Sequence, residues 1–190
     1  MTSFLRRHRH FFSTAVFLAA IIGILFYVEP IKIIAAIGVK NMYVAVFLFA
    51  IVGGVSAFTA TSFYASLFAF ALGGGDPLFL AIFSAPGVLI GDYLFWYLGH
   101  KGKPIVKPAI EHILERTSRW LSAKPAWFIP AAAYVYTGFV PLPGEFLMVT
   151  LALIGISFKR IFIPTLFGNF TLAFIVSSSA SYGISIFGFL

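Results

Sequence analysis

The sequence contains no cysteine and very little charge. Only 10% of its 190 residues are charged, whereas 61% are hydrophobic and the mean hydropathy is +1.00. Charged residues make up about 25% of a typical soluble domain, so this chain cannot form the polar shell of a soluble fold. A soluble enzyme and a disordered tail are therefore excluded, and the lack of cysteine excludes a disulfide scaffold. An integral membrane protein of a single domain remains.

Acidic residues are especially scarce, with 6 Asp and Glu against 13 Lys and Arg, which gives a net charge of +7. The basic residues lie beside apolar runs, an arrangement that favours contact with anionic lipid headgroups over nucleic acid. The four histidines are scattered and cysteine is absent, so no metal site and no cofactor is expected. Membrane lipids are the expected partners, and self-association into a homo-oligomer stays open.

Residues 1–41 predict an N-terminal spanning helix followed by an interfacial connector. Three arginines precede the 18-residue apolar run 11–28, which is long enough to cross the hydrocarbon core. No small-residue cleavage site follows this run, so we expect an uncleaved helix whose start is cytoplasmic. The inner membrane is the expected location.

Two later apolar stretches are interrupted in the middle. Residues 42–72 contain no charge, and Gly53-Gly54 and the segment FTATS at 58–62 divide them into halves of 11 and 10 residues. Neither half can span a bilayer, which predicts a re-entrant helical hairpin shielded by protein or a wet cavity. Residues 127–154 are broken in the same way by TGFVPLPGE at 137–145. The expected hairpin tips are Thr59, Thr61, Ser62, Pro141, Pro143 and Gly144.

Uninterrupted spans are predicted at 78–98 and 161–176, with a polar linker at 99–126 between the two halves. Apolar and charged residues of this linker fall on different faces of a helix. We expect it to lie on the membrane or on the protein's own cytoplasmic surface, with a solvated connector as the alternative. His100, Lys101 and Lys103 are candidate contacts to lipid headgroups, or positively charged anchors of the cytoplasmic side.

The halves 42–98 and 127–190 resemble each other in the order broken segment, turn, long span. Gly73 aligns with Gly155, and Gly87 with Gly168. If the basic N-terminus and the linker are both cytoplasmic, the two hairpins enter from opposite faces. The sequence therefore predicts an all-α membrane fold in which spanning helices and two opposed re-entrant hairpins form an inverted repeat around a midplane site.

Two stretches carry a resemblance to a known family and cover about residues 50–180. Gly87, Gly91, Asp92, Trp96 or Tyr97, and Gly99 follow a Gly-x-x-x-Gly-Asp-x-x-x-Tyr-x-x-Gly pattern, with His100 or Lys101 in place of an arginine. Residues 137–169 have a proline-containing loop, then a segment that ends in small residues, and then a helix. The chain thereby resembles the DedA family, within the wider VTT or SNARE-associated membrane superfamily.

The resemblance implies movement of lipids between leaflets, with undecaprenyl phosphate or phospholipids as cargo and protons as a coupling ion. The sequence departs from the family at both tips. The first tip has no acidic residue. At the second, Phe139 and Pro141 fit, but Gly138 and Gly144 stand where the family has arginines. The resemblance thus provides no arginine pair to hold a phosphate.

Glu145 and Asp92 are the candidate transport or proton-carrier residues, because a carboxylate inside an apolar run is costly. Glu145 could instead favour the start of a helix electrostatically. Asp92 could bind a proton, hold a hairpin tip by accepting N–H bonds, or pair with a lysine or hydroxyl. Asn169 is expected to form an interhelical hydrogen bond.

Three functions stay open from the residues alone. The first is a lipid transporter or scramblase, the second a proton-coupled exporter of small solutes or ions, and the third a non-transporting membrane scaffold. No Ser-His-Asp set, HExxH motif or paired-carboxylate pattern is present, so an enzyme is not expected.

Overall fold

The computed structural model describes residues 42–55, 57–102, 108–140 and 144–182. The regular elements of this part of the chain are all helices, which confirms the all-α expectation. The predicted N-terminal helix and connector, together with Lys103, Pro141 and Pro143, lie outside the described residues. In chain order the helices are α4 (Met42–Gly53), α5 (Ala57–Leu72), α6 (Pro77–Gly102), α7 (Pro108–Ser122), α8 (Phe128–Phe139), α9 (Gly144–Leu153) and α10 (Phe158–Ser181).

Among the described residues, α6 and α10 are the two helices that are long and apolar enough to cross a membrane. Both exceed the predicted spans, since α6 has 26 residues and α10 has 24. The expected boundary between residues 98 and 99 therefore falls inside α6. The helices continue through polar residues beyond the apolar runs from which the spans were predicted. In α6 these residues include His100 and Lys101 of the last turn.

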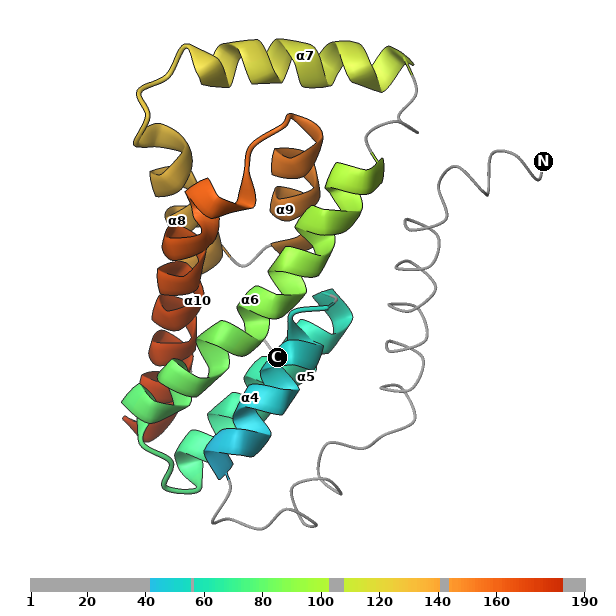
Figure 1. Cartoon of the computed structure of the whole chain (residues 1–190). Coiled ribbons are helices and arrows are strands. Elements are labelled where there is room, and N and C mark those ends of the chain that lie inside the picture. The colour runs from blue at the N-terminus through green and yellow to red at the C-terminus, as the bar shows by residue number, and fades with distance from the viewer. Residues whose placement is uncertain (1–41, 56, 103–107, 141–143, 183–190) are drawn as a thin grey trace, which may run out of the picture.

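Short helices form two pairs beside the long ones (Figure 1). The open ends of α4 and α5 lie at the end of the bundle away from α7, whereas those of α8 and α9 lie near α7. Each pair joins close to the middle of α6. The first helix of each pair packs on the long helix that follows it, α4 on α6 and α8 on α10. The second packs on the other long helix, α5 on α10 and α9 on α6.

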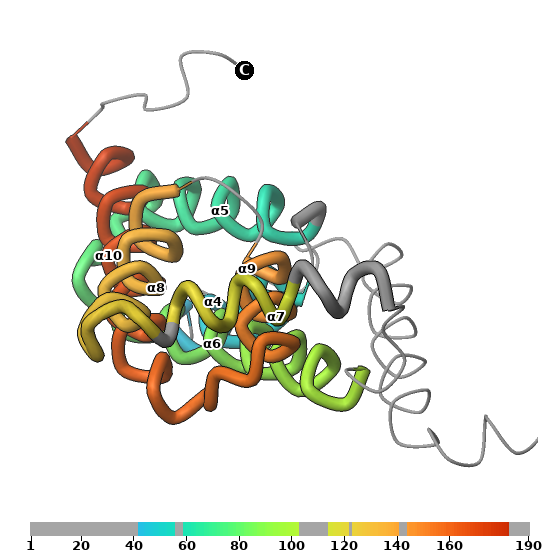
Figure 2. The backbone as a smooth tube through the Cα atoms, turned by 90° about the horizontal axis from the view of Figure 1, so that it is seen from above, coloured from blue at the N-terminus to red at the C-terminus, as the bar shows by residue number. Residues whose placement is uncertain are grey.

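Contacts along α6 place both junctions at the same level. A Cβ atom at Gly91 would overlap the Gly54 carbonyl group, in the turn after α4, whereas one at Gly144 would lie 2.8 Å from Asp92 Oδ1. Successive residues of α6, Gly91 and Asp92, thus touch the two junctions. Viewed along the bundle, α5 and α6 line opposite sides, with α4 and α9 between them (Figure 2).

The break in the first pair differs from the prediction. The described turn residues are Gly54 and Val55, and the segment FTATS belongs to α5. Thr59 remains near the turn because its Oγ1 donates to the Val52 carbonyl oxygen at 2.9 Å, but Thr61 and Ser62 are exposed side chains on α5. Of the three residues predicted at the tip, Thr59 thus lies close to the turn and the other two lie further along α5, since hydroxyl side chains can bond to nearby carbonyls and remain helical.

The helices α5 and α9 end with the same backbone geometry, 81 residues apart. Gly74 and Gly155 have φ of +92° and +89°. The amides of Gly75 and Ile156 donate to carbonyls five residues earlier, Phe70 and Leu151, at 3.0 and 2.9 Å. These are two Schellman caps, in which glycine adopts the left-handed conformation. The structure therefore matches Gly74 rather than Gly73 to Gly155, and it keeps Gly87 with Gly168.

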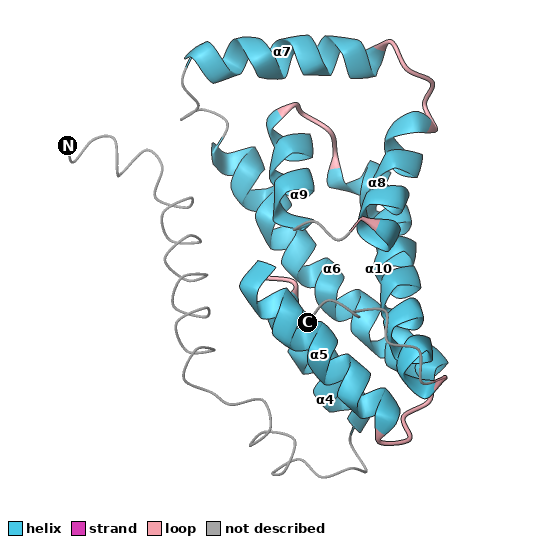
Figure 3. Ribbon diagram, turned by 180° about the vertical axis from the view of Figure 1, so that it is seen from behind, coloured by secondary structure: helices cyan, strands magenta, loops and turns pink. Residues whose placement is uncertain are grey.

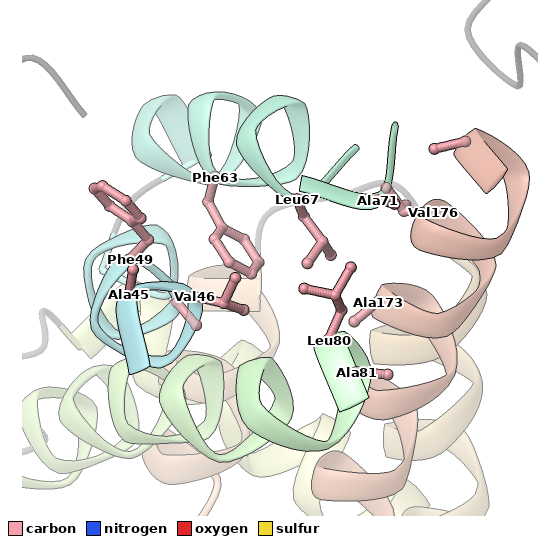
Figure 4. Close-up of a cluster of buried hydrophobic side chains, with 12 residues drawn as sticks. Ala45, Val46, Phe49, Phe63, Leu67, Ala71, Leu80, Ala81, Ala173 and Val176 are labelled. Carbon is pink, nitrogen blue, oxygen red and sulfur yellow. The ribbon is translucent and has the colours of Figure 1, made fainter. Parts of the chain in front are cut away.

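Two apolar clusters fill the two ends of the bundle. The cluster away from α7 combines α4, α5, the first half of α6 and the second half of α10. In Figure 4, Phe63 and Leu67 of α5 point toward Val46 of α4 and Leu80 of α6. The cluster near α7 combines the rest of α6 and α10 with α8 and α9. In both, short side chains such as Ala50, Ala81 and Ala133 allow the close helix packing that is typical of membrane proteins.

The linker helix α7 lies across one end of the bundle (Figure 3). Leu114 and Leu121 pack against the cluster beneath it, and Ser118 Oγ donates to the Ile154 carbonyl oxygen at 3.3 Å. Arg116 and Trp120 are exposed on it. Of the alternatives left open by the sequence, the structure thus shows a helix whose apolar face rests on the protein itself. It is also shorter than the predicted linker 99–126.

Candidate functional site

Asp92 is the most deeply buried acid of the described residues, with 4% of its surface exposed. It lies near the middle of α6, where a carboxylate is costly unless it has a partner. The partner comes from the middle of α10, because Asn169 Nδ2 donates to Asp92 Oδ2 at 2.7 Å. This bond confirms the interhelical role expected of Asn169, and it joins the two long helices at their centres.

The start of α9 lies directly beside this acid. A Cβ at Gly144 would lie 2.8 Å from Asp92 Oδ1, which is too close for a carbon–oxygen contact. Any residue other than glycine at this position would therefore displace the Asp92 carboxylate. The carboxylate consequently lies against the N-terminal end of a helix, whose dipole favours negative charge. Asp92 thus lies beside the second tip, in keeping with the expectation that it could hold a tip in place.

Glu145 is the second acid of the site and belongs to the first turn of α9. It is partly exposed, and its carboxyl group interacts electrostatically with that of Asp92. The two candidate acids, 53 positions apart in the chain, are therefore neighbours. Tyrosines from each short pair accompany them, since the phenol of Tyr64 on α5 interacts electrostatically with Asp92, and that of Tyr136 on α8 with Glu145.

Hydroxyl groups on α8 and α10 complete the polar surroundings. Thr165 is fully buried, and its Oγ1 has no hydrogen-bond partner among the described residues. It lies one turn from Asn169 on the same buried face of α10, because residues four apart share a helix face. Thr137 of α8 is also buried and touches Gly168. We call Asp92, Glu145, Thr165 and Asn169 the polar layer, because they lie between the two apolar clusters.

The other candidate residues lie away from this layer. His100 is exposed and stacks on Trp96 with ring centroids 5.1 Å apart, and the Lys101 ammonium lies 5.6 Å from the Tyr97 ring centroid. Both residues therefore lie at the α7 end of α6. Either could contact a lipid headgroup or act as a positively charged anchor of the cytoplasmic side. Lys101 is nine residues beyond Asp92 on the same helix, so it is not the partner that the sequence allowed for this acid.

Sequence reasoning missed three members of the site. Tyr64, Tyr136 and Thr165 read as ordinary residues of apolar helices, and their relevance depends on which faces α5, α8 and α10 turn toward α6. The spacing of Thr165 and Asn169, four positions apart on one span, was the only available signal.

In the part of the chain that the structure describes, the fold is all-helical, with two candidate membrane-spanning helices and a buried polar layer between them. No family model matches the chain, and neither a curated protein nor a solved structure matches it. The resemblance to the DedA family therefore stays a prediction from the motifs.

Proposed function

We propose that this protein is a DedA-like membrane transporter that moves lipids, undecaprenyl phosphate or a phospholipid, between leaflets. In this proposal α6 and α10 cross the membrane, and the pairs α4–α5 and α8–α9 are re-entrant hairpins that enter from opposite faces. Broken helices that meet near the midplane are a recurrent way to build a transport site. The observation that carries the proposal is that two successive residues near the middle of α6 touch the two pairs, Gly91 at Gly54 and Asp92 at Gly144.

The matched geometry of the two halves supports an inverted repeat. The Schellman caps, the starts of α6 and α10, and the packed glycines Gly87 and Gly168 all recur at a spacing of 81 residues. Gly87 packs against α4 and Gly168 against α8, so each long helix uses its glycine against the first helix of its own half. Opposite orientation of the two pairs in Figure 1 fits such a repeat.

Charge supports the orientation. The described Lys and Arg residues lie in the last turn of α6, on or just after α7, and in the first turn of α10, and they are Lys101, Arg116, Arg119, Lys124, Lys159 and Arg160. Arg160 Nη2 donates to the carbonyl oxygen of Ala126, in the segment after α7, at 2.9 Å. Exposed tryptophans accompany them, and the Lys124 ammonium lies 4.6 Å from the centroid of the Trp120 ring. Positive residues favour the cytoplasmic side, and tryptophans favour the interface. We therefore place α7 at the cytoplasmic face of the inner membrane.

The polar layer also suits coupling to protons. Asp92 and Glu145 are neighbouring carboxyl groups inside an apolar bundle, and we propose that one of them carries a proton during transport. The same two acids would serve a proton-coupled exporter of small solutes, which is the second candidate function. A non-transporting scaffold is the third, and it requires neither acid.

Leaflet exchange in liposomes tests the proposal. We expect the purified, reconstituted protein to speed the movement of acyl-labelled lipids from the inner to the outer leaflet, measured by chemical quenching of the outer label. Exchange no faster than in protein-free liposomes would contradict lipid transport. A flux of soluble substrate driven by a pH gradient, without lipid movement, would instead support the exporter.

A further inference from the structure

We infer that one corner of the α7 end of the bundle binds the headgroup of an anionic phospholipid of the cytoplasmic leaflet. The corner consists of Trp120 on α7, Lys124 and Trp127 between α7 and α8, and Lys159 and Arg160 in the first turn of α10. We call these five residues the basic corner. The inference rests on the membrane placement of the proposed function, but it does not require that the protein transports lipids.

Direct contacts hold the basic corner together at the α7 end of the bundle (Figure 1). Arg160 Nη2 donates to the Ala126 carbonyl oxygen at 2.9 Å, which ties the first turn of α10 to the segment after α7. The rings of Trp120 and Trp127 both lie against Phe128, with ring centroids 5.8 and 6.3 Å from it. Residues from three parts of the chain therefore meet at one place on the surface.

The positive charge of the basic corner is held by groups that carry no negative charge. The Lys124 ammonium lies 4.6 Å from the centroid of the Trp120 ring, and the Arg160 guanidinium donates to a carbonyl oxygen. Lys159 is exposed, and the first turn of α10 contains no acid. Along the chain, the nearest acid with a described side chain is Glu115, nine residues before Lys124. Three cations with this little compensation attract an anion.

Arg160 has the geometry to bind a phosphate group. A guanidinium has five N–H donors in one plane, and it binds phosphate oxygens in pairs. The bond to Ala126 uses one donor of an exposed side chain, so further donors remain for a ligand. Because this bond already restricts the side chain, Arg160 loses less conformational freedom when a ligand binds.

Apolar side chains beside the cations favour a phospholipid over an acidic peptide. The side chains of Trp120 and Trp127 are 53% and 66% exposed, and indoles favour the interface between headgroups and hydrocarbon. Ile163 and Phe167 are also exposed, and they follow Arg160 by three and seven positions, on the same face of α10. A phosphate at Arg160 would therefore have its acyl chains along an apolar helix face.

Quenching of tryptophan fluorescence by brominated lipids tests the basic corner. The chain has three tryptophans, so Trp96→Phe leaves only the two of the corner to emit. This variant is reconstituted in mixtures of phosphatidylglycerol and phosphatidylcholine, with bromine on the acyl chains of one lipid or the other. Bromine quenches an indole only at close range, so the two samples report which lipid lies at the corner. We expect the relative binding constant to favour phosphatidylglycerol at least about fivefold.

Two results of this experiment overturn the inference. Equal quenching by the two lipids would mean that the indoles lie at the interface without a preferred headgroup. Quenching by neither lipid would mean that the corner lies away from the membrane, which favours an acidic protein partner instead. If Trp96→Phe does not fold, the difference in emission between the unaltered protein and Trp127→Phe isolates the signal of Trp127.

Variants connect the lipid preference to the cations of the basic corner. We expect Arg160→Gln and Lys124→Gln each to lower the preference for phosphatidylglycerol at least about twofold, because each removes a charge beside the headgroup. Arg119→Gln is the matched control, since it removes the same charge from an exposed position four residues after Glu115, and it should keep the preference. An unchanged preference in both corner variants, or an equal loss in all three, overturns the site. If Arg160→Gln does not fold, Lys124→Gln and the control decide.

Leaflet exchange separates this inference from the proposed function, because it is measured independently of the quenching. Equal quenching by both lipids together with fast exchange contradicts the basic corner but keeps lipid transport. Preferential quenching by brominated phosphatidylglycerol without any exchange keeps the basic corner and contradicts lipid transport.

Discussion

Gly91→Ala is expected to destabilise the protein by about 3 kcal/mol, which corresponds to a melting midpoint lower by roughly 10 °C. A Cβ at this position overlaps the Gly54 carbonyl group, and both partners are backbone, so no side chain can move aside. The turn between α4 and α5 must shift away from α6. The measurement is the thermal midpoint of purified protein in detergent.

The matched control for this substitution is Gly73→Ala. There the nearest atoms to a new Cβ are backbone oxygens at 3.4 Å, which is ordinary contact, so the midpoint should change little. Equal midpoints for the two variants would contradict the close packing of Gly54, in the turn after α4, on α6. A large loss confined to Gly91→Ala would support it.

Asp92→Asn is expected to lower lipid exchange at least about tenfold, because it removes a carboxyl group that we propose as a proton carrier while keeping the size of the side chain. A tenfold loss corresponds to about 1.4 kcal/mol in the barrier. The measurement is the initial rate of leaflet exchange per reconstituted protein. The fold should survive, since an amide oxygen can still accept the hydrogen bond from Asn169.

Asp76→Asn serves as the control for this prediction. Asp76 Oδ1 accepts bonds from the amides of Leu78 and Phe79 at 2.8 and 3.2 Å, so it caps the start of α6 away from the polar layer. Asn caps helices about as well as Asp, so the rate should stay near that of the unaltered protein. A normal rate for Asp92→Asn would refute a role for this acid in transport and favour the scaffold.

Local sequence signals predicted the broken segments well but not the detail of each break. Glycine, proline and charge marked the ends of α6, the break before Gly144 and the polar linker, because these residues act on the backbone nearby. The hydroxyl groups of FTATS predict that it belongs to the first break, but the segment is part of α5. A hydroxyl can bond within its own helix there, as Ser66 Oγ does by donating to the Ser62 carbonyl oxygen at 2.8 Å.

The chemistry of the site was predictable only as separate residues. Glu145 and Asp92 stood out because each interrupts an apolar run. Their proximity, and the bond between Asp92 and Asn169 across 77 positions, depend on how α6 meets α9 and α10. Apart from its spacing from Asn169, Thr165 gave no signal, because a threonine in an apolar helix commonly bonds to its own backbone, and only the packed structure shows that it does not.

Labelling of single cysteines from each side of the membrane tests the central claim, that the two hairpins enter from opposite faces. The chain has no native cysteine, so each introduced thiol is the only one. Asp76, between α5 and α6, Ala123, after α7, and Ser157, before α10, are all exposed. With a membrane-impermeant maleimide, Asp76→Cys should react only from outside, and Ala123→Cys and Ser157→Cys only from the cytoplasmic side. Reaction of Ala123→Cys and Ser157→Cys from different sides, or of all three from one side, would contradict the account.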